Sequence, residues 1–180
     1  MDLPKKVTLK DGRIATIDFL SEKDSVRELQ RFINALVKEN TYIHYDRKVS
    51  LKEEEEWKKK RISDMRKREG YVLIAKMDGK IAGSSGAQRE RLKGRNNIAL
   101  GIVISRPHRG LGLGKALLTV NISTARKLLK PNNIYLSLLS PNKRAYSLYK
   151  KLGFEEFAIF PKWLLHNGKY VDQVFLKLKR

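Results

Sequence analysis

The most informative stretch of the chain is Arg109-Gly110-Leu111-Gly112-Leu113-Gly114-Lys115, which follows an apolar run over residues 98–104. An apolar strand, a glycine-rich turn and then a long helical pattern can direct several backbone N–H groups at one point, where the positive end of the helix dipole adds to them. Such an arrangement is typical of a diphosphate site. It leaves the ligand open, because a strand followed by Gly-x-Gly also occurs in dinucleotide and nucleoside triphosphate sites.

Two of these alternatives do not match the residues that follow. A nucleoside triphosphate loop needs a wider spacing between its glycines and a Lys-Ser or Lys-Thr pair, whereas Lys115 is followed by Ala116. A dinucleotide-binding unit needs an acidic residue about 20 positions further on, whereas residues 127–133 contain no acid. A different diphosphate ligand is therefore expected.

The pattern after the glycines predicts alternating helices and strands. A helix is expected to run to about Lys130, where Pro131-Asn132 ends it. After a strand at residues 134–139, Ser140-Pro141 places a proline in the first turn of a helix that runs to Leu152 and is capped by Gly153. The remaining segments are strands at residues 154–160 and 170–178, with a loop at residues 161–169 that contains Asn167-Gly168.

The pattern before the glycines predicts two hairpins with two helices between them. The hairpins turn at Asp11-Gly12 and Asp78-Gly79, and their strands cover residues 6–10, 13–19, 71–77 and 80–87. Ser21 with Asp24 resembles a capping box for a helix to about Lys38, and Ser50 with Glu53 resembles one for a second helix, which Gly70 stops. A basic turn at residues 93–97 follows the second hairpin.

The second predicted helix is rich in charge. Glu54, Glu55 and Glu56 each precede a lysine by four residues, which is the spacing of ion pairs along a helix. We therefore expect a solvated face of ion pairs and no metal or substrate role for these carboxylates.

Composition narrows the class of protein. A chain of 180 residues with 41% hydrophobic residues is expected to form a single domain over residues 1–180. The chain has no cysteine and three scattered histidines, His44, His108 and His166, so neither disulfides nor a metal site are predicted. No apolar run approaches the roughly 20 residues of a membrane helix, and a cytoplasmic protein without a membrane partner is expected.

The charge balance is strongly basic. The chain has 39 Lys and Arg against 19 Asp and Glu, a formal net charge of +20, and such a field attracts anions of any kind. Nucleic acid is a candidate partner that is not favoured, because no zinc-finger, recognition-helix or aromatic-basic pattern accompanies the charge. A polyanionic cofactor accounts for part of the charge. The oligomeric state stays open between a monomer and a homodimer.

Two sets of residues together match one known family. The first is Arg109, Gly112 and Gly114, which fit a motif of Arg or Gln, two residues, Gly, one residue, and Gly or Ala. The second set is Asn142, Ala145, Leu148, Tyr149, Gly153 and Phe154, an asparagine that opens a helix followed by Ala, Leu-Tyr and Gly-Phe. With these sets in this element order, residues 102–154 resemble the GCN5-related N-acetyltransferase (GNAT) superfamily of acyl-CoA-dependent amine acetyltransferases. Residues 1–45 are more loosely similar to the branch that includes ribosomal-protein N-terminal acetyltransferases.

The resemblance implies an α/β (α+β) fold with a central mixed, mostly antiparallel, twisted sheet of about seven strands flanked by four helices. The parallel neighbours at residues 98–104 and 134–139 would splay apart and bind acetyl-CoA between them. A bulge near Gly101 would fit a strand that must bend, since glycine within a strand often marks that distortion.

The resemblance also implies which residues bind acetyl-CoA. Main-chain groups of Ile102, Val103 and Ile104 would bind the pantetheine arm as another strand would. The diphosphate would lie against the loop, whose residues are Arg109, Gly110, Leu111, Gly112, Leu113, Gly114 and Lys115. The glycines have no Cβ to keep phosphates away from the backbone. Arg106 and Lys143 are further candidates for nearby positive charge, with ordinary surface charge as the alternative.

Asn142 and Tyr149 are seven residues apart, or two helical turns, so one helix face can contact the cofactor twice. When an amine attacks the thioester, the thiolate of CoA leaves, and a phenol with a pKa near 10 can protonate a thiolate whose acid has a pKa of about 8.5. Tyr149 is the candidate catalytic donor, and the alternative is a packing tyrosine. Asn142 would bond the pantetheine or order the loop, with a helix cap as the alternative.

The sequence indicates less clearly which group removes the proton from the acceptor amine. Some relatives carry a glutamate five residues before the motif asparagine, and here that position is Ser137. The remaining candidates are Glu39, His44, Glu90 and Asp172, or a chain of water molecules. We expect the first helices and the loop at residues 161–169 to form the pocket for the acceptor.

Two hypotheses on function follow. The first is an N-acetyltransferase that transfers acetyl from acetyl-CoA by direct attack in a ternary complex. Its acceptor is a primary amine, a protein N-terminus or lysine first and a polyamine or small amine next. The alternative is a basic CoA-binding module without turnover that docks on nucleic acid or a ribosomal partner.

Overall fold

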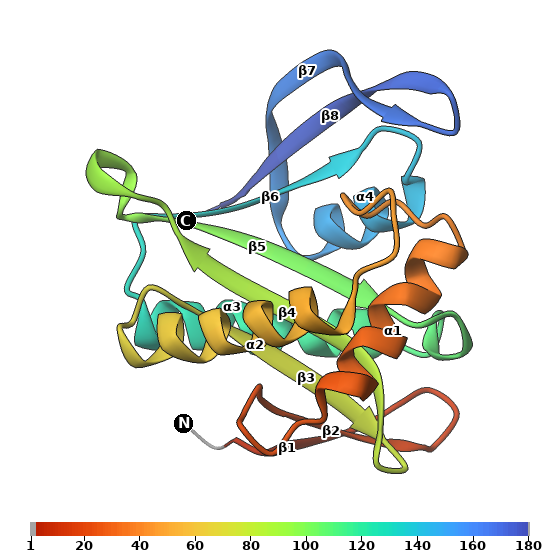
Figure 1. The fold of residues 1–180 in the computed structure, drawn as a ribbon. Coiled ribbons are helices and arrows are strands. Elements are labelled where there is room, and N and C mark those ends of the chain that lie inside the picture. The colour runs from red at the N-terminus through yellow and green to blue at the C-terminus, as the bar shows by residue number, and fades with distance from the viewer. Residues whose placement is uncertain (1–2, 180) are drawn as a thin grey trace.

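One sheet of eight strands organises the chain (Figure 1). In the computed structural model, which describes residues 3–179, the strand order is β1-β2-β3-β4-β5-β6-β8-β7, and β5–β6 is the one parallel pair. The strands are β1 (Lys5–Thr8), β2 (Ile14–Phe19), β3 (Gly70–Met77), β4 (Lys80–Arg89), β5 (Asn97–Ile104), β6 (Asn133–Leu139), β7 (Phe154–His166) and β8 (Lys169–Leu178). The helices are α1 (Val26–Lys38), α2 (Leu51–Arg66), α3 (Leu113–Leu128) and α4 (Lys143–Lys151), with short 3-10 turns η1 (Leu92–Gly94) and η2 (Arg106–His108).

The predicted fold class is confirmed. The sheet is mixed and mostly antiparallel, and four α-helices flank it. It has eight strands, the number of strand segments that the sequence pattern predicts, where the resemblance implied about seven. Both strands of the N-terminal hairpin join its edge, β2 next to β3 and β1 outermost.

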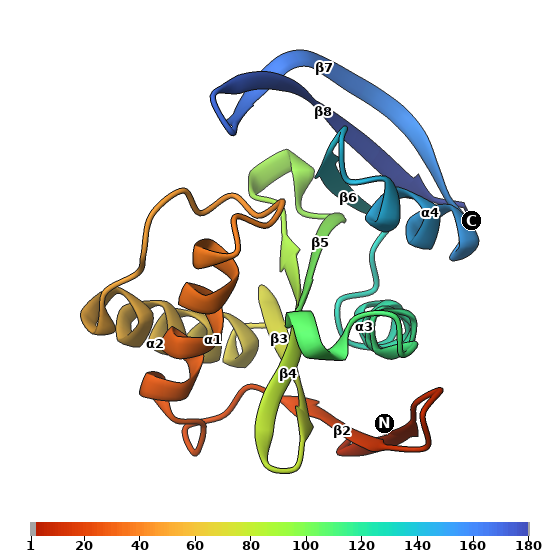
Figure 2. The ribbon, with the colours of Figure 1, turned by 90° about the vertical axis from the view of Figure 1, so that its right-hand side faces the viewer.

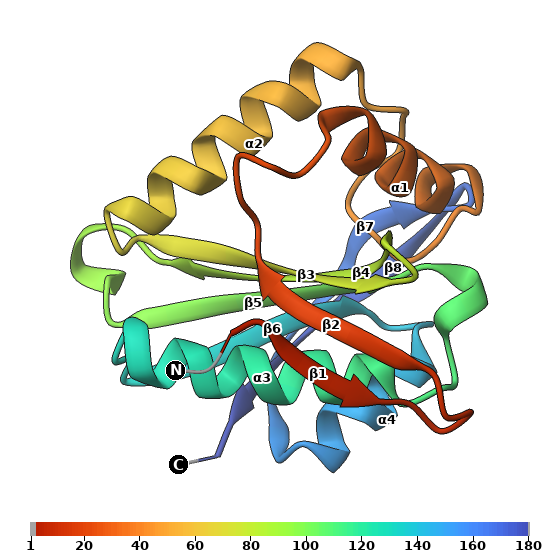
Figure 3. The same ribbon diagram turned by 90° about the horizontal axis from the view of Figure 1, so that it is seen from below.

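The helices form two layers, one on each face of the sheet. Figure 3 shows α1 and α2 on one side of the strands and α3 and α4 on the other. The alternation of side chains along β3 explains both layers, since successive residues of a strand point to opposite faces. Val72 and Ile74 pack with α1 and α2, whereas Tyr71 and Leu73 belong to the larger core that includes α3. We call these the α1/α2 face and the α3/α4 face.

The expected splay between the two parallel strands is present. β5 and β6 pair over three positions, from Asn97 opposite Asn133 to Ala99 opposite Tyr135. Beyond that point the two strands diverge, and Figure 1 shows the resulting V between them. The backbone of β5 after Ala99 and of β6 after Tyr135 therefore faces open space on one side.

The predicted bulge near Gly101 is wrong. Gly101 lies opposite Gly86 in a regular antiparallel register with β4, and the irregularity of that region lies between Ala75 and Lys76 of β3. A Cβ at Gly101 would meet no atom within 4 Å. Gly101 therefore leaves space on the α1/α2 face, and β5 separates from β6 without an extra residue.

Three predicted helix boundaries shift. Ser21 was predicted to cap the first helix, but Ser25 is the N-cap of α1. Asp24 does accept hydrogen bonds from Ser21, in a turn that precedes the helix. Gly70 begins β3, and Arg68, with φ of 57°, makes the turn after α2. Pro141 precedes α4, because the side chain of Asn142 accepts a hydrogen bond from the N–H of Ala145 and so caps the helix.

The predicted loop at residues 161–169 is mostly strand. β7 continues to His166, and Asn167-Gly168 forms a two-residue turn into β8. The register shifts between Phe160 and Leu164, where β7 carries extra residues relative to β8. Pro161 and Lys162 obscured the strand pattern in the sequence because they lie in this irregular part.

The face of ion pairs predicted for α2 is only partly correct. The Ser50–Glu53 capping box is confirmed, and Lys59 pairs with Glu55 at 2.8 Å. Glu54 and Lys58 are buried instead. The Lys58 ammonium donates hydrogen bonds to the backbone oxygens of Glu22 and Asp24, at 2.8 and 2.6 Å, and so attaches α2 to the turn before α1.

Candidate functional site

A cavity of about 750 Å³ opens where β5 and β6 diverge. Its wall includes β5 from Leu100 to the strand's end and residues 137–139 of β6. The glycine loop, the first turn of α3 and one face of α4 line its side on the α3/α4 face, and residues 42–45 between α1 and α2 line its other side. The cavity therefore crosses the sheet.

The glycine loop has the geometry of an anion cradle. Gly110 and Gly112 have φ of 86° and 90°, which side chains rarely adopt, and Gly112 is the N-cap of α3. No side chain caps α3, so the N–H groups of its first turn are available to a ligand. A Cβ at Gly114 would lie 3.4 Å from Leu148 and would fill the space between the loop and α4. The residues present fit a diphosphate.

The positive charge at this loop comes partly from residues that the sequence did not single out. Lys10, Lys115 and Arg144 line the cavity, whereas Arg106 and Lys143 do not. The backbone N–H of Lys10 donates to the carbonyl of Leu111 at 3.0 Å, which places the β1–β2 turn beside the loop. No signal in the sequence joins Lys10 to residues about 100 positions away. On α4, the guanidinium of Arg144 lies beside Gly110, and the choice between Arg144 and its neighbour Lys143 depends on which face of α4 meets the loop.

Arg109 is held by protein groups. Its Nε donates to the carbonyl of Ile104 at 2.9 Å, and its two terminal nitrogens bond both carboxylate oxygens of Glu39, one of them at 2.9 Å. Glu39 is the C-cap of α1. Arg109 therefore links the end of β5 to the end of α1, and its charge is balanced by a carboxylate.

The predicted strand residues divide between the two faces. Ile102 and Ile104 contact α3 near Gly114, and Val103 lies on the α1/α2 face with Gly101. All four line the cavity. Leu111 and Leu113 pack in or against the core, and Leu113 is fully buried, so only their backbones can serve a ligand.

Asn142 and Tyr149 both line the cavity from α4, as their spacing predicted. Tyr149 is 5% exposed, and its ring lies 6.1 Å from that of Phe154. Burial raises the pKa of Tyr149 to about 12. Its hydroxyl has no hydrogen-bond partner within residues 3–179, so it is a protonated donor free to bond a ligand.

The candidate bases are dispersed. His44 lines the cavity, as does Ser137, whose hydroxyl accepts a hydrogen bond from Gln173 at 3.0 Å. Glu39 is committed to Arg109, and Glu90 accepts a hydrogen bond from Tyr135. Asp172 accepts one from the backbone of Lys162.

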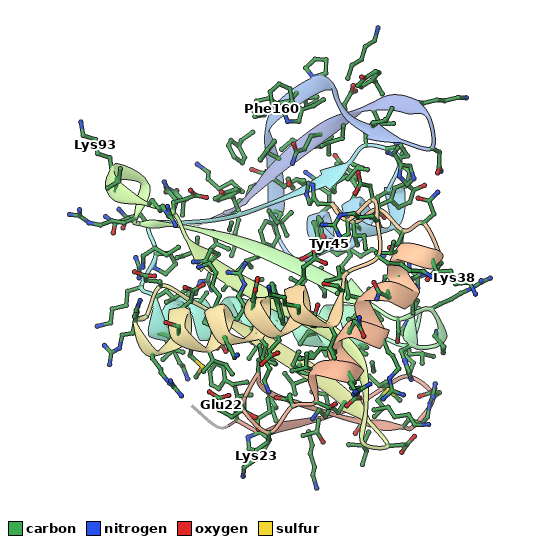
Figure 4. All side chains as sticks on the ribbon, viewed as in Figure 1. Glu22, Lys23, Lys38, Tyr45, Lys93 and Phe160 are labelled. Atoms are coloured by element: carbon green, nitrogen blue, oxygen red, sulfur yellow. The ribbon has the colours of Figure 1, made fainter. Side chains whose placement is uncertain are left out.

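The end of the cavity on the α1/α2 face is enclosed by residues from distant parts of the chain. The ring of Tyr42 lies 4.8 Å from that of His166 at the tip of the β7–β8 hairpin, and Asn40 bonds Asn167. Tyr45 also lines the cavity, and in the view of Figure 4 it lies over the opening between β5 and β6. Burial, and then the charge of Glu54, raise the pKa of Tyr45, and burial raises the pKa of Glu54 to about 7.

Within residues 3–179, no group of three His, Asp or Glu side chains is placed to hold a metal ion. None of the described helices is both long enough and apolar enough to cross a membrane.

Comparisons with known proteins agree with this geometry. An L-amino acid N-acetyltransferase, AaaT of Escherichia coli (strain K12), is 30% identical over 105 residues, which cover 58% of this chain and 65% of that protein. The match thus spans slightly less than two thirds of this curated relative.

Solved structures share the fold. One is yncA of Salmonella typhimurium, described as an acetyltransferase with its cofactor acetyl-CoA, at 24% identity and a TM-score of 0.80 over 92% of this chain and 93% of that chain. Another is a ribosomal-protein-alanine N-acetyltransferase from Brucella melitensis, at 24% identity and a TM-score of 0.80 over 89% and 97% of the two chains. The family model described as acetyltransferase (GNAT) family matches residues 29–154, and this chain belongs to that family.

Proposed function

We propose that the protein is an N-acetyltransferase that transfers the acetyl group of acetyl-CoA to a primary amine. A protein N-terminus or a lysine side chain is the first acceptor class, and polyamines or small amines are the next. The observation that carries the proposal is one cavity that combines an uncapped helix N-terminus behind glycines, the unpaired edges of two splayed strands, and a buried tyrosine hydroxyl.

Acetyl-CoA supplies an acetyl thioester, a diphosphate and a pantetheine arm with amide groups, and each has matching residues. Amides of residues 110–115 bind the diphosphate, with Lys10, Lys115 and Arg144 as neighbouring cations. On the open side of β5, backbone groups of Ile102 and the N–H of Ile104 bond the pantetheine amides as an added strand would. The backbone of Val103 pairs with Ser84 of β4, and the Ile104 carbonyl accepts from Arg109, so Val103 contributes its side chain to the cavity wall. Asn142 acts mainly as the N-cap that places α4 and Tyr149 against the cavity.

Tyr149 holds the proton that the departing thiolate takes up. The pKa of about 12 keeps the phenol protonated at neutral pH, and the residue lines the cavity. General acid catalysis of this kind contributes roughly 10²–10⁴-fold to a rate.

The acceptor amine loses its proton at the other end of the cavity. Four side chains were predicted as candidate bases, and of these His44 lines the cavity. The proton passes to His44 directly, or to bulk solvent through water beside Ser137.

The relatives frame the range of acceptors. One curated relative is named for L-amino acids, and one structural relative for a ribosomal protein alanine. The protein is therefore tested with acetyl-CoA and a panel of free amino acids, peptides with free N-termini, peptides with internal lysine and polyamines, by following thiol release. Release with one class assigns the acceptor. No release from any of them while CoA still binds in calorimetry would favour the non-catalytic CoA-binding module.

A further inference from the structure

Five aromatic side chains form a continuous stripe on the sheet. They are Tyr135 of β6, Phe175 of β8, and Phe157, Phe160 and Trp163 of β7, and we call them the aromatic stripe. Ring centroids are 6.4 Å apart for Tyr135–Phe157, 6.2 Å for Phe157–Phe175, 4.9 Å for Phe175–Phe160 and 5.3 Å for Phe160–Trp163. Phe157, Phe160 and Trp163 are 54%, 41% and 62% exposed, which is a large apolar surface for one region.

The stripe lies on the α1/α2 face, beyond the helices of that layer. Leu136 and Leu176 of the paired strands point into the core on the α3/α4 face, so Tyr135 and Phe175, which alternate with them, point the other way. Helices α1 and α2 pack over β3 and β4. Figure 2 shows the β7–β8 hairpin curving away from α4 towards the side that carries α1.

The stripe is continuous with the end of the cavity on this face. Phe175 is the cross-strand partner of Ser137, and Phe160 is the partner of Gln173. Gln173 in turn donates to the Ser137 hydroxyl, which lines the cavity. The glycine loop and α3 lie on the opposite face, so the stripe borders the mouth that is left for an acceptor.

A second copy of the chain is a poor occupant of this surface. β7 is the edge strand of the sheet, but two register shifts interrupt it, and Pro161 and Lys162 lie in the second one. Bulges, prolines and lysines are the features that block pairing between sheet edges. Two copies would also each bring a formal charge of +20. The same charge favours a partner that is acidic.

We propose that the aromatic stripe docks the polypeptide that carries the acceptor amine. The partner is an acidic segment with an aromatic or large aliphatic side chain a few residues from the amine. From β6 to β7 the stripe crosses two strand spacings, about 10 Å, which an extended chain spans in about three residues. The amine lies at the cavity mouth beside Ser137, and the apolar side chain lies on Phe160 and Trp163. This inference rests on the proposed function, because it selects among its acceptor classes.

The test compares Trp163→Ala and Phe160→Ala with Tyr170→Ala. Tyr170 is 68% exposed on the same hairpin, but it points to the α3/α4 face, away from the aromatic stripe. It is therefore the matched control. The acceptors are an acidic 12-residue peptide with a free N-terminus and Phe at position 4, the same peptide with Ala there, and the dipeptide of its first two residues. Trp163→Ala is expected to raise KM for the Phe peptide about tenfold. KM for the dipeptide and for acetyl-CoA, and all values of Tyr170→Ala, stay within about twofold.

Equal KM for the Phe and Ala peptides in the unchanged protein, or an equal loss for peptide and dipeptide in Trp163→Ala, would overturn the proposal. So would a dimer that Trp163→Ala converts to a monomer in sedimentation, or a labelled 12-nucleotide RNA that displaces the peptide and depends on Trp163. Fluorescence anisotropy of the labelled peptide on the CoA-loaded protein separates the two proposals. Peptide binding that Trp163→Ala weakens, without thiol release from any acceptor, supports the docking surface and contradicts the enzyme.

Discussion

The two ends of the cavity are built from the chain in different ways. The end on the α3/α4 face comes mainly from two short segments, the end of β5 with the glycine loop and the first two turns of α4, and Lys10 of the β1–β2 turn joins them from a distant part of the chain. The end on the α1/α2 face is lined by residues 42–45 and Ser137 of β6, and beside it Asn40 bonds Asn167 at the tip of the β7–β8 hairpin, 127 positions away. The first end depends on local backbone geometry, and the second depends on how distant elements pack. Substitutions at the two ends should therefore change different quantities.

The largest effect is expected for Tyr149→Phe. Removing the hydroxyl should lower kcat at least about 10²-fold, because a general acid contributes at least that much. The dissociation constant of CoA should change less than about threefold, since the ring still packs against Phe154. Steady-state kinetics and calorimetry measure the two quantities. Tyr146→Phe is the control on the same helix, because that hydroxyl donates to Glu156 on the surface. Near-normal turnover would make Tyr149 a packing residue.

Gly112→Val should weaken CoA binding by about tenfold to a hundredfold. Its φ of 90° forces a side chain into a strained conformation at the N-cap of α3, and the strain of roughly 1–3 kcal/mol is relieved by moving the amides that hold the diphosphate. Gly79→Val is the control, because Gly79 has φ of 75° in the β3–β4 turn, away from the cavity. Calorimetric titration with CoA measures the dissociation constant of each variant. If both variants bind CoA like the unchanged protein, the cradle is not at this loop.

Glu54→Gln tests the acceptor end through stability. Burial raises the pKa of Glu54 from 4.5 to about 7, so between these values the unfolded chain ionises while the folded chain keeps the proton. The free energy of unfolding therefore falls as pH rises through this window and levels off above it. Glu54→Gln should be about 3 kcal/mol more stable than the unchanged protein at pH 8, since folding raises the pKa of Glu54 by about 2.5, and equally stable at pH 4.

Thermal or urea unfolding at the two pH values measures this difference. The control is Glu55→Gln, because Glu55 pairs with Lys59 on the surface and its loss should slightly lower stability at pH 8. A Glu54→Gln variant that is less stable at pH 8 would show that the carboxylate is stabilised by a partner. The same variant, assayed for turnover, also reports whether the carboxylate beside Tyr45 serves the acceptor.

The smallest effect is expected for Glu39→Gln. If Arg109 connects β5 to the end of α1, both Glu39→Gln and Arg109→Lys should loosen residues 40–45 and raise the acceptor KM severalfold, with roughly 1 kcal/mol lost in stability. The dissociation constant of CoA should change less than twofold for Glu39→Gln. Hydrogen exchange of residues 39–45 gives an independent reading. Tighter CoA binding by Glu39→Gln would instead show that Arg109, once released, binds the phosphates.

Local pattern predicted the parts of the molecule whose geometry is local. The glycine loop, Tyr149 and the capping box at Ser50 each depend on residues within two helical turns of one another, and each lies where the pattern placed it. Boundaries failed where another group competed for the same role. Ser25 took the cap predicted for Ser21, and Asn142 displaced Pro141 from the first turn of α4.

Charge was the property that pattern predicted least well. Helical spacing matched Glu54 with Lys58 on a solvated face, but α2 packs with that face towards the protein. Arg109 was expected at the phosphates and is bound by Glu39, 70 positions away. Spacing within one helix carries no information about which face the rest of the chain will cover, nor about which distant carboxylate will arrive beside a guanidinium.

From the order of residues alone follow the element types, the glycine cradle and the aligned pair of Asn142 and Tyr149, because these require only backbone propensities and periodicity. The mixed sheet was implied by the resemblance to a known family. Packing of distant elements decided the rest. It placed Lys10 and Arg144 at the loop, committed Arg109 to Glu39, buried Glu54 beside Tyr45 and left the aromatic stripe uncovered next to Ser137. These features depend on contacts between segments up to about 130 residues apart, and such contacts exist only once the sheet has brought its strands together.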